Sequence, residues 1–145
     1  MIPLRINGKE AWTPTMEDTP YQRLGGTEAI KVLVEAFYDI MEAEEPELKA
    51  THRLDDAGKV PRELRDKVAL YIVGWLGGPQ DYTATHGHPR LRMRHGHVPV
   101  DIGLRDAWTR CMSKALDQVG VQGPVRTFLD QKFVDLADHL RNRPG

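Results

Sequence analysis

The sequence predicts an all-α protein. In four long stretches of the 145-residue chain, apolar residues recur every three or four positions, which is the period of an amphipathic helix. No segment alternates apolar and polar residues as a half-buried strand does. Glycines and prolines separate the stretches, and a chain of this length is expected to form one domain around a single core. We therefore expect a small helical bundle.

The first part of the chain is expected to hold an arm, a long helix and a loop. Residues 1–20 contain three prolines and no sustained period, which predicts an extended N-terminal arm. Thr27 is expected to cap a helix that ends at the acidic residues before Pro46. Residues 47–59 read as a short helical turn and a loop. The apolar face of the helix comprises Ile30, Leu33, Val34, Phe37, Ile40 and Met41.

Three further long helices are expected in the remainder of the chain. The second begins at Pro61 and stops before Gly77-Gly78-Pro79, with Leu64, Val68, Tyr71, Ile72 and Trp75 on one face. Glycines and prolines limit residues 77–99 to short helices. The third long helix starts near Asp101 and ends at Gly120, and the fourth runs from Pro124 to about Leu140. Such a set fits a bundle or a globin-like packing.

Composition excludes several classes of function. Twenty basic and twenty-one acidic residues leave a net charge of −1, so no broad basic surface predicts nucleic-acid or membrane binding. The single cysteine, Cys111, cannot form an intramolecular disulfide, and its place on an apolar stripe predicts an inert side chain. The acidic cluster Glu42, Glu44, Glu45 and Glu47 is expected to be a solvated helix end rather than a cation site. With no signal peptide or membrane span in view, we expect a cytoplasmic protein.

A loop rich in histidine and arginine is the main candidate for chemistry. His86, His88, His95 and His97 lie within a dozen residues, with arginines between them. Neutral imidazole is the commonest metal ligand, and guanidinium groups suit carboxylates and phosphates. The pattern predicts a metal centre whose organic part is negatively charged. By itself it does not choose among the four histidines, and solvated loop histidines remain an alternative.

Separated motifs resemble those of a known family. They are Phe37-Tyr38, Gly77-Gly78-Pro79 followed by Tyr82, the run from His88 to His95, and the run from Asp106 through Trp108 to Met112. Their order and spacing resemble the truncated haemoglobins of group II, from Tyr21 to about Leu140. The resemblance implies a globin domain over residues 21–145, in which two helices pack over two others around haem b, preceded by an extension over residues 1–20.

The resemblance also assigns the groups that hold haem. It implies that His95 is the proximal iron ligand, because the family's ligand ends an Arg-x-Arg-His run and is followed five residues later by a branched apolar residue, here Val100. Arg92, Arg94 and Tyr82 are then candidates to bind the haem propionates through guanidinium and phenol groups. From the residues alone, the arginines could equally serve only to keep the loop soluble.

The distal pocket follows from the same resemblance. Tyr38 and Trp108 correspond to the family's distal donors, although the pattern alone fits a core tyrosine and a helix-packing aromatic. Leu64 and Val68 correspond to positions that face the iron, one of which is polar in many globins; here both are apolar. His52, placed by its distance from Asp55-Asp56, takes a position where the family commonly has tyrosine or phenylalanine. We expect His52 to hydrogen-bond distal ligands; iron coordination by both His52 and His95, or a ring turned to solvent, are the alternatives.

These residues imply a haem protein that binds dioxygen and other diatomic ligands at an iron that is pentacoordinate or modulated by His52. Several donors around one ligand slow its release and favour O2/NO redox chemistry or scavenging over delivery. The alternatives are a peroxidase or peroxynitrite-detoxifying enzyme with His52 as acid–base group, a haem-based redox sensor, and a helical domain without haem. The expected small ligands are O2, NO, CO or peroxide. No flavin or nicotinamide fingerprint is present, so the electron donor is expected to be separate, and monomer and homodimer both stay open.

Overall fold

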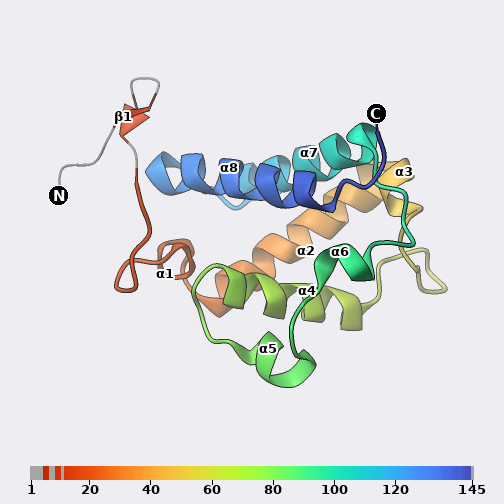
Figure 1. Ribbon diagram of the computed structural model, residues 1–145, viewed down its shortest axis with the longest axis horizontal. Helices are drawn as coiled ribbons and strands as arrows, with labels where there is room; N and C mark the ends of the chain where they lie inside the picture. Colours follow the sequence, from red (N-terminus) through yellow and green to blue (C-terminus); the bar gives the residue numbers. More distant parts are fainter. Residues whose placement is uncertain (1–4, 7–8, 11, 145) are drawn as a thin grey trace.

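A computed structural model confirms the helical architecture (Figure 1). It describes residues 5–6, 9–10 and 12–144. Two short strands, β1 (Arg5–Ile6) and β2 (Lys9–Glu10), pair antiparallel near the N-terminus. Among the described residues, no helix is long and apolar enough to cross a membrane. The helices are α1 (Pro20–Leu24), α2 (Thr27–Glu44), α3 (Pro46–Lys49), α4 (Arg62–Trp75), α5 (Asp81–His86), α6 (Leu91–Arg94), α7 (Ile102–Gln118) and α8 (Gly123–Leu140).

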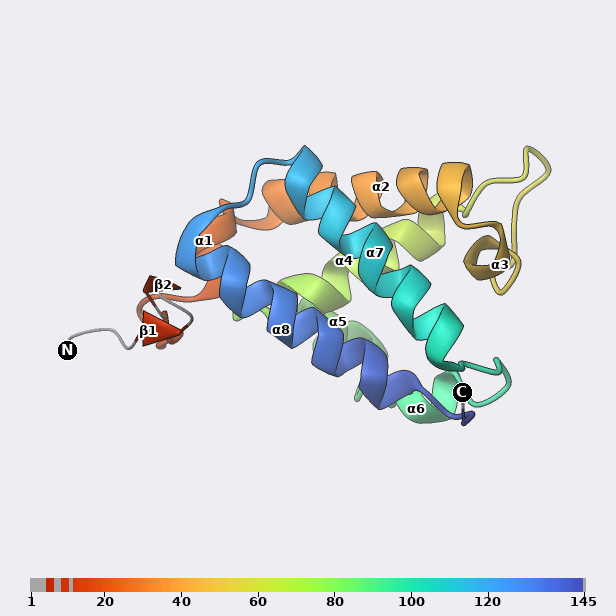
Figure 2. The same ribbon diagram turned by 90° about the horizontal axis from the view of Figure 1, so that it is seen from above.

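The four long helices form two layers, with α7 and α8 lying over α2 and α4 (Figures 1 and 2). Helix α2 packs against both α4 and α7, and α7 packs against α8. Most side chains predicted to face inward on α2 are buried, whereas most of those on α4, such as Val68 and Trp75, are partly buried against the core. Burying each large aliphatic side chain contributes about 1.5–3 kcal/mol. The short helices α5 and α6 lie beside this body, as the glycines and prolines of residues 77–99 predicted. The fully buried centre includes Ile30, Leu33, Met41, Leu76, Leu116, Leu129 and Phe133.

The start of α2 differs by one residue from the prediction. Gly26, with φ of 90°, is the N-cap, and Thr27 is the first helical residue. The Thr27 hydroxyl instead shares a hydrogen bond of 2.8 Å with the hydroxyl of Tyr21. The expected Thr27 cap is therefore wrong, because a tertiary contact takes the side chain that would have capped the helix.

Helix α1 was not predicted, and both its N-terminus and the segment before it are held in place by side-chain contacts. Thr19 and Gln22 form a capping box, in which each side chain bonds the other's backbone N–H. Upstream, the Trp12 ring meets Phe128 of α8 edge-on at 5.2 Å, and its indole N–H donates to Asp18 at 2.9 Å. The predicted extended arm is therefore packed against the helical body at Trp12, because this large aromatic ring contacts an apolar ring of the last helix.

Glycine at position 78 allows α1 to lie against the end of α4. A Cβ atom at Gly78 would approach the Tyr21 ring to 2.5–2.9 Å, closer than carbon atoms pack. The Tyr21 N–H also donates to the carbonyl of Leu76 at 2.9 Å. Gly78 therefore does more than stop α4, because it leaves the space that Tyr21 fills.

A buried arginine joins α2 to α4. Arg65 is only 5% exposed, and its guanidinium lies 2.7 Å from Glu42 and 3.0 Å from both Glu35 and Asp39. Its Nε donates to the carbonyl of Val60 at 3.1 Å. The prediction of a solvated acidic helix end is wrong for Glu42, whose side chain is 10% exposed and also accepts the Val60 N–H. This carboxylate is buried because Arg65 neutralises it.

Candidate functional site

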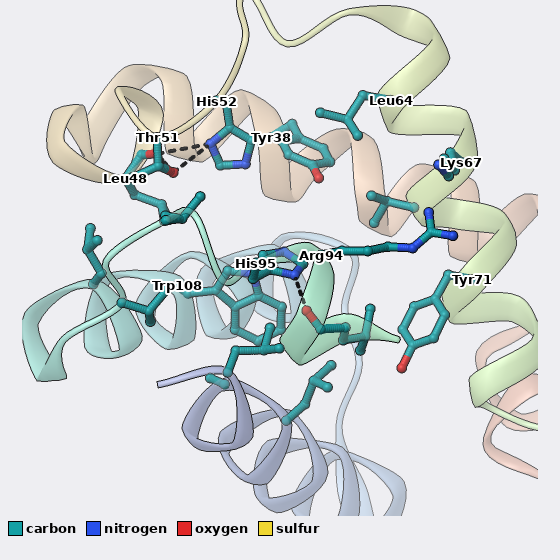
Figure 3. Close-up of a pocket in the computed structure, with 18 of the residues that line it drawn as sticks. Tyr38, Leu48, Thr51, His52, Leu64, Lys67, Tyr71, Arg94, His95 and Trp108 are labelled. Atoms are coloured by element: carbon teal, nitrogen blue, oxygen red, sulfur yellow. Dashed lines mark hydrogen bonds between the residues drawn. The ribbon is translucent and has the colours of Figure 1, made fainter. Parts of the chain in front are cut away.

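A cavity of about 380 Å³ is lined by residues from α2 to α8 and from the loops that follow α3 and α6 (Figure 3). Its size is within the range of pockets that hold small molecules and cofactors. Most of its wall is apolar, with a few polar and charged groups placed around it. The apolar lining includes Leu48, Leu64, Val68, Ile72, Leu91, Val98, Val100, Leu104, Leu136, Ala137 and Leu140.

His95 directs one ring nitrogen at this cavity. It follows the last residue of α6, and its Nδ1 lies 2.8 Å from the carbonyl of Leu91 (Figure 3). A carbonyl only accepts, so Nδ1 carries the proton and the neutral ring keeps a lone pair on Nε2. Metal-binding histidines are commonly oriented by such a bond from their second nitrogen. The Nε2 lone pair of His95 is therefore available to a metal without reorientation of the ring.

The other histidines of the loop lack this arrangement. His86 and His88 are exposed and do not line the cavity, and Nδ1 of His88 accepts the backbone N–H of Arg90 at 3.1 Å. His97 is exposed and lines only part of the wall. Of the four histidines in the loop, only His95 thus combines a cavity position with a fixed Nδ1.

His52 repeats the arrangement of His95 on the opposite wall (Figure 3). It lies just beyond α3, with Nδ1 3.0 Å from the carbonyl of Leu48 and 3.1 Å from the hydroxyl of Thr51, which itself donates to that carbonyl. The neutral ring therefore keeps its lone pair on Nε2. Burial lowers the pKa of His52, and the facing His95 lowers it further. A ring in this state accepts a hydrogen bond, and the donor role expected from the sequence requires its protonated form.

Tyr38 and Trp108 supply donors. Both line the cavity, and neither the Tyr38 hydroxyl nor the Trp108 indole N–H bonds to any residue that the structure describes. Phe37 packs between them, 5.1 Å from the Tyr38 ring and 5.3 Å from the Trp108 ring, and Tyr38 meets His52 edge-on at 5.9 Å. Burial raises the pKa of Tyr38, so its hydroxyl keeps its proton. Both groups can therefore donate a hydrogen bond to a ligand bound in the cavity.

Two predicted apolar positions and one predicted phenol also line the cavity. Leu64 and Val68 lie on α4, one turn apart, and add no polar group to its wall. Tyr82 is buried, and its ring meets Tyr71 edge-on at 5.7 Å.

The cavity also has a cationic side. The side chain of Arg94 extends toward Lys67 and Tyr71 of α4, and all three line the cavity (Figure 3). Neither Arg94 nor Lys67 forms an ion pair with a residue that the structure describes. The side chain of Arg92, the other predicted partner, lies outside the described residues. Sequence reasoning missed Lys67, although its place between Leu64 and Val68 puts it on the same stretch of α4.

The described residues offer no cluster of protein ligands for a bare metal ion. Within the described part of the chain, no three His, Cys, Asp or Glu side chains gather around one point. A metal held by His95 must therefore receive most of its ligands from a cofactor. This apolar cavity has an imidazole on each of two walls and two cations that pair with no described acidic residue. It suits a flat, apolar metal complex with carboxylates, and haem has this chemistry.

Comparison with known proteins supports the inference of a haem site. The model of the family described as "Bacterial-like globin" matches residues 19–142. The chain belongs to the bacterial-like globins, and among them to the group II truncated haemoglobins. It is 36% identical over 126 residues to the group 2 truncated hemoglobin YjbI of Bacillus subtilis, covering 87% of this chain and 90% of that protein.

Solved structures show that the truncated haemoglobin fold extends over most of the chain. The group II truncated hemoglobin of Bacillus anthracis has a TM-score of 0.78 at 34% identity, covering 88% of this chain and 98% of that one. The oxygen-avid truncated haemoglobin of Bacillus subtilis has a TM-score of 0.76 at 37% identity, covering 86% and 99%. As a globin, this truncated haemoglobin binds haem and, through it, small diatomic ligands such as O2.

Proposed function

We propose that this truncated haemoglobin binds haem b through His95 and retains a diatomic ligand tightly, for O2/NO redox chemistry or scavenging in the cytoplasm. The fixed Nδ1 of His95, bonded to the Leu91 carbonyl at 2.8 Å, is the observation that carries the proposal. It leaves Nε2 for the iron of a cofactor lying in the cavity. The haem iron supplies reversible ligand binding and one-electron chemistry.

The remaining cavity groups have distinct roles in this proposal. Arg94 and Lys67, with the Tyr82 phenol, bind the propionates, and Arg92 is a further candidate. Tyr38 and Trp108 donate to the partial negative charge of a bound diatomic ligand. Leu64 and Val68 keep that side of the cavity apolar. These two donors, which bond no other described residue, stabilise the bound state, and a Bacillus subtilis relative is described as oxygen-avid.

Optical spectra of the ferric, ferrous and CO-bound protein test the proposal. A Soret band should appear on haem addition. The ferrous spectrum should have the bands of a histidine-ligated haem, and His95→Ala should abolish these bands. The matched control is His88→Ala, which changes a histidine of the same loop that does not line the cavity. A protein without a Soret band, or spectra that His95→Ala leaves unchanged, would contradict the proposal.

A second candidate function is peroxide or peroxynitrite detoxification, favoured by the state of His52. Its Nε2 bears a lone pair, faces the cavity and stays neutral because burial lowers its pKa. A base in this position would accept a proton from hydrogen peroxide in the cavity at Nε2. Stopped-flow mixing of ferric protein with peroxide should show a slower reaction in His52→Ala. The Tyr38→Phe variant, which removes a donor but no base, should react at nearly the wild-type rate, and equal rates in all three proteins would exclude this function.

A further inference from the structure

The residues after α8 hold the loop that carries His95. The chain returns at its C-terminal end to the segment that follows α6 (Figure 2). There the side-chain Oδ1 of Asn142 accepts the backbone N–H of Val100 at 2.8 Å. Its Nδ2 donates to the carbonyl of Val98 at 2.9 Å and to that of His95 at 3.4 Å. One half-buried amide thus bonds three backbone groups of a loop that lies more than 40 positions earlier in the chain.

The backbone adds a second set of bonds. The N–H groups of Asn142 and Arg143 both donate to the carbonyl of Val100, at 2.9 and 3.1 Å. The loop itself contributes the Val98 N–H, which donates to the His95 carbonyl at 3.0 Å. Within the described residues, residues 98–100 are neither helix nor strand, so these bonds to the C-terminal tail replace the ladder of a regular element.

We propose that Asn142 is a positioning residue for the proximal ligand. It fixes the backbone that leaves His95, while the Leu91 carbonyl fixes the ring. Val98 and Val100 line the cavity, so the same amide also positions part of the cavity wall. This role rests on the proposed function of His95. Only an amide fits, because the Oδ1 site faces a donor and the Nδ2 site faces two carbonyl acceptors.

The chemistry of the amide gives two informative variants. Asn142→Asp keeps the size and the acceptor for Val100 but places a second oxygen against the carbonyls of Val98 and His95. Asn142→Ala removes all three side-chain bonds. Arg141→Ala is the matched control, because Arg141 is adjacent and forms a surface ion pair with Asp138 at 3.3 Å, outside the contacts to the loop.

Two measurements on the haem-loaded protein test the proposal. The iron–histidine stretching band of the ferrous form should shift or broaden in both Asn142 variants, and transfer of haem to an acceptor globin should become roughly fivefold or more faster. Arg141→Ala should match the wild type in both. Should Asn142→Ala fail to fold, Asn142→Asp alone decides.

The outcomes separate the two proposals. No iron–histidine band in the wild type overturns the role of His95, and the role of Asn142 with it. A normal wild-type band that both Asn142 variants leave unchanged overturns the role of Asn142 alone. This holds even if their melting temperatures fall, because a merely structural residue lowers stability without moving the band.

Discussion

The ion-pair cluster around Arg65 allows a quantitative prediction. Replacing Arg65 by Met keeps an unbranched apolar stem but removes the guanidinium that Glu42, Glu35 and Asp39 share. Glu35 retains its ion pair with Arg62, and Asp39, with 64% of its side chain exposed, can be rehydrated. Glu42 cannot, because its carboxylate is 10% exposed and is left with the Val60 N–H and a Lys59 amine 4.0 Å away.

The loss of stability in Arg65→Met should therefore be that caused by one buried charge without a full partner, the Glu42 carboxylate. Breaking a buried pair costs about 3–5 kcal/mol, and partial compensation by Val60 and Lys59 places Arg65→Met near the lower bound. The free energy of unfolding should fall by about 3 kcal/mol, a large part of the roughly 5–15 kcal/mol typical of a domain. At about 2–4 °C per kcal/mol, the melting temperature should fall by roughly 6–12 °C.

Urea unfolding followed by circular dichroism measures this difference. The matched control is Arg62→Met, which also removes an arginine of α4 paired with Glu35, but one that is 64% exposed, so about 0–1 kcal/mol should be lost. Adding Glu42→Gln to Arg65→Met should recover part of the lost free energy of unfolding, because it removes the buried negative charge that no longer has an arginine partner. Equal losses in Arg65→Met and Arg62→Met, or no recovery in the double variant, would refute the reasoning.

Three other predictions concern the cavity and the fold. Tyr38→Phe should release O2 about tenfold faster in stopped-flow experiments, because one hydrogen bond of roughly 1–1.5 kcal/mol is lost; an unchanged rate would show that Tyr38 does not contact the ligand. Gly78→Ala should lower the free energy of unfolding by about 1–3 kcal/mol, since the new Cβ meets the Tyr21 ring, and a neutral effect would contradict that contact. Because burial lowers the pKa of His52 below 6.5, the unfolded ring takes up a proton before the folded one, so stability should fall as pH drops below 6.5. Urea titrations at several pH values should show a flatter profile in His52→Gln, and identical profiles would argue against a buried neutral ring.

Features carried by local periodicity could be predicted from the sequence. The four long helices appeared because their apolar residues repeat over 14 or more positions, which averages out single exceptions. Helix α1, with five residues, is too short to show a period, and only the Thr19–Gln22 pair signals it. The choice of His95 among four histidines came from the resemblance to group II truncated haemoglobins, whose Arg-x-Arg-His run is also a local pattern.

Features that depend on distant contacts could not be predicted. Nothing near Glu42 in the sequence indicates that its partner is Arg65, 23 positions away, so a solvated carboxylate was the natural expectation. Asn142 likewise shows no local pattern, because its partners belong to a loop more than 40 positions earlier. Tertiary contacts decide whether such polar residues are exposed, and the chain approaches itself there only after folding.

The two imidazoles that face the cavity are held by the same kind of local hydrogen bond, which predicts how many protein ligands the iron has. In both cases Nδ1 donates to the carbonyl four residues earlier, Leu48 for His52 and Leu91 for His95, so each ring presents the lone pair of Nε2. Sequence spacing alone therefore does not distinguish a proximal from a distal ligand. His52 has a second partner in the Thr51 hydroxyl, so any movement of the ring out of its present position costs both bonds. We therefore expect the unliganded ferrous protein to be five-coordinate, with His95 as its one protein ligand. A low-spin six-coordinate ferrous spectrum that disappears in His52→Ala would show instead that the bonds to Leu48 and Thr51 yield to the iron.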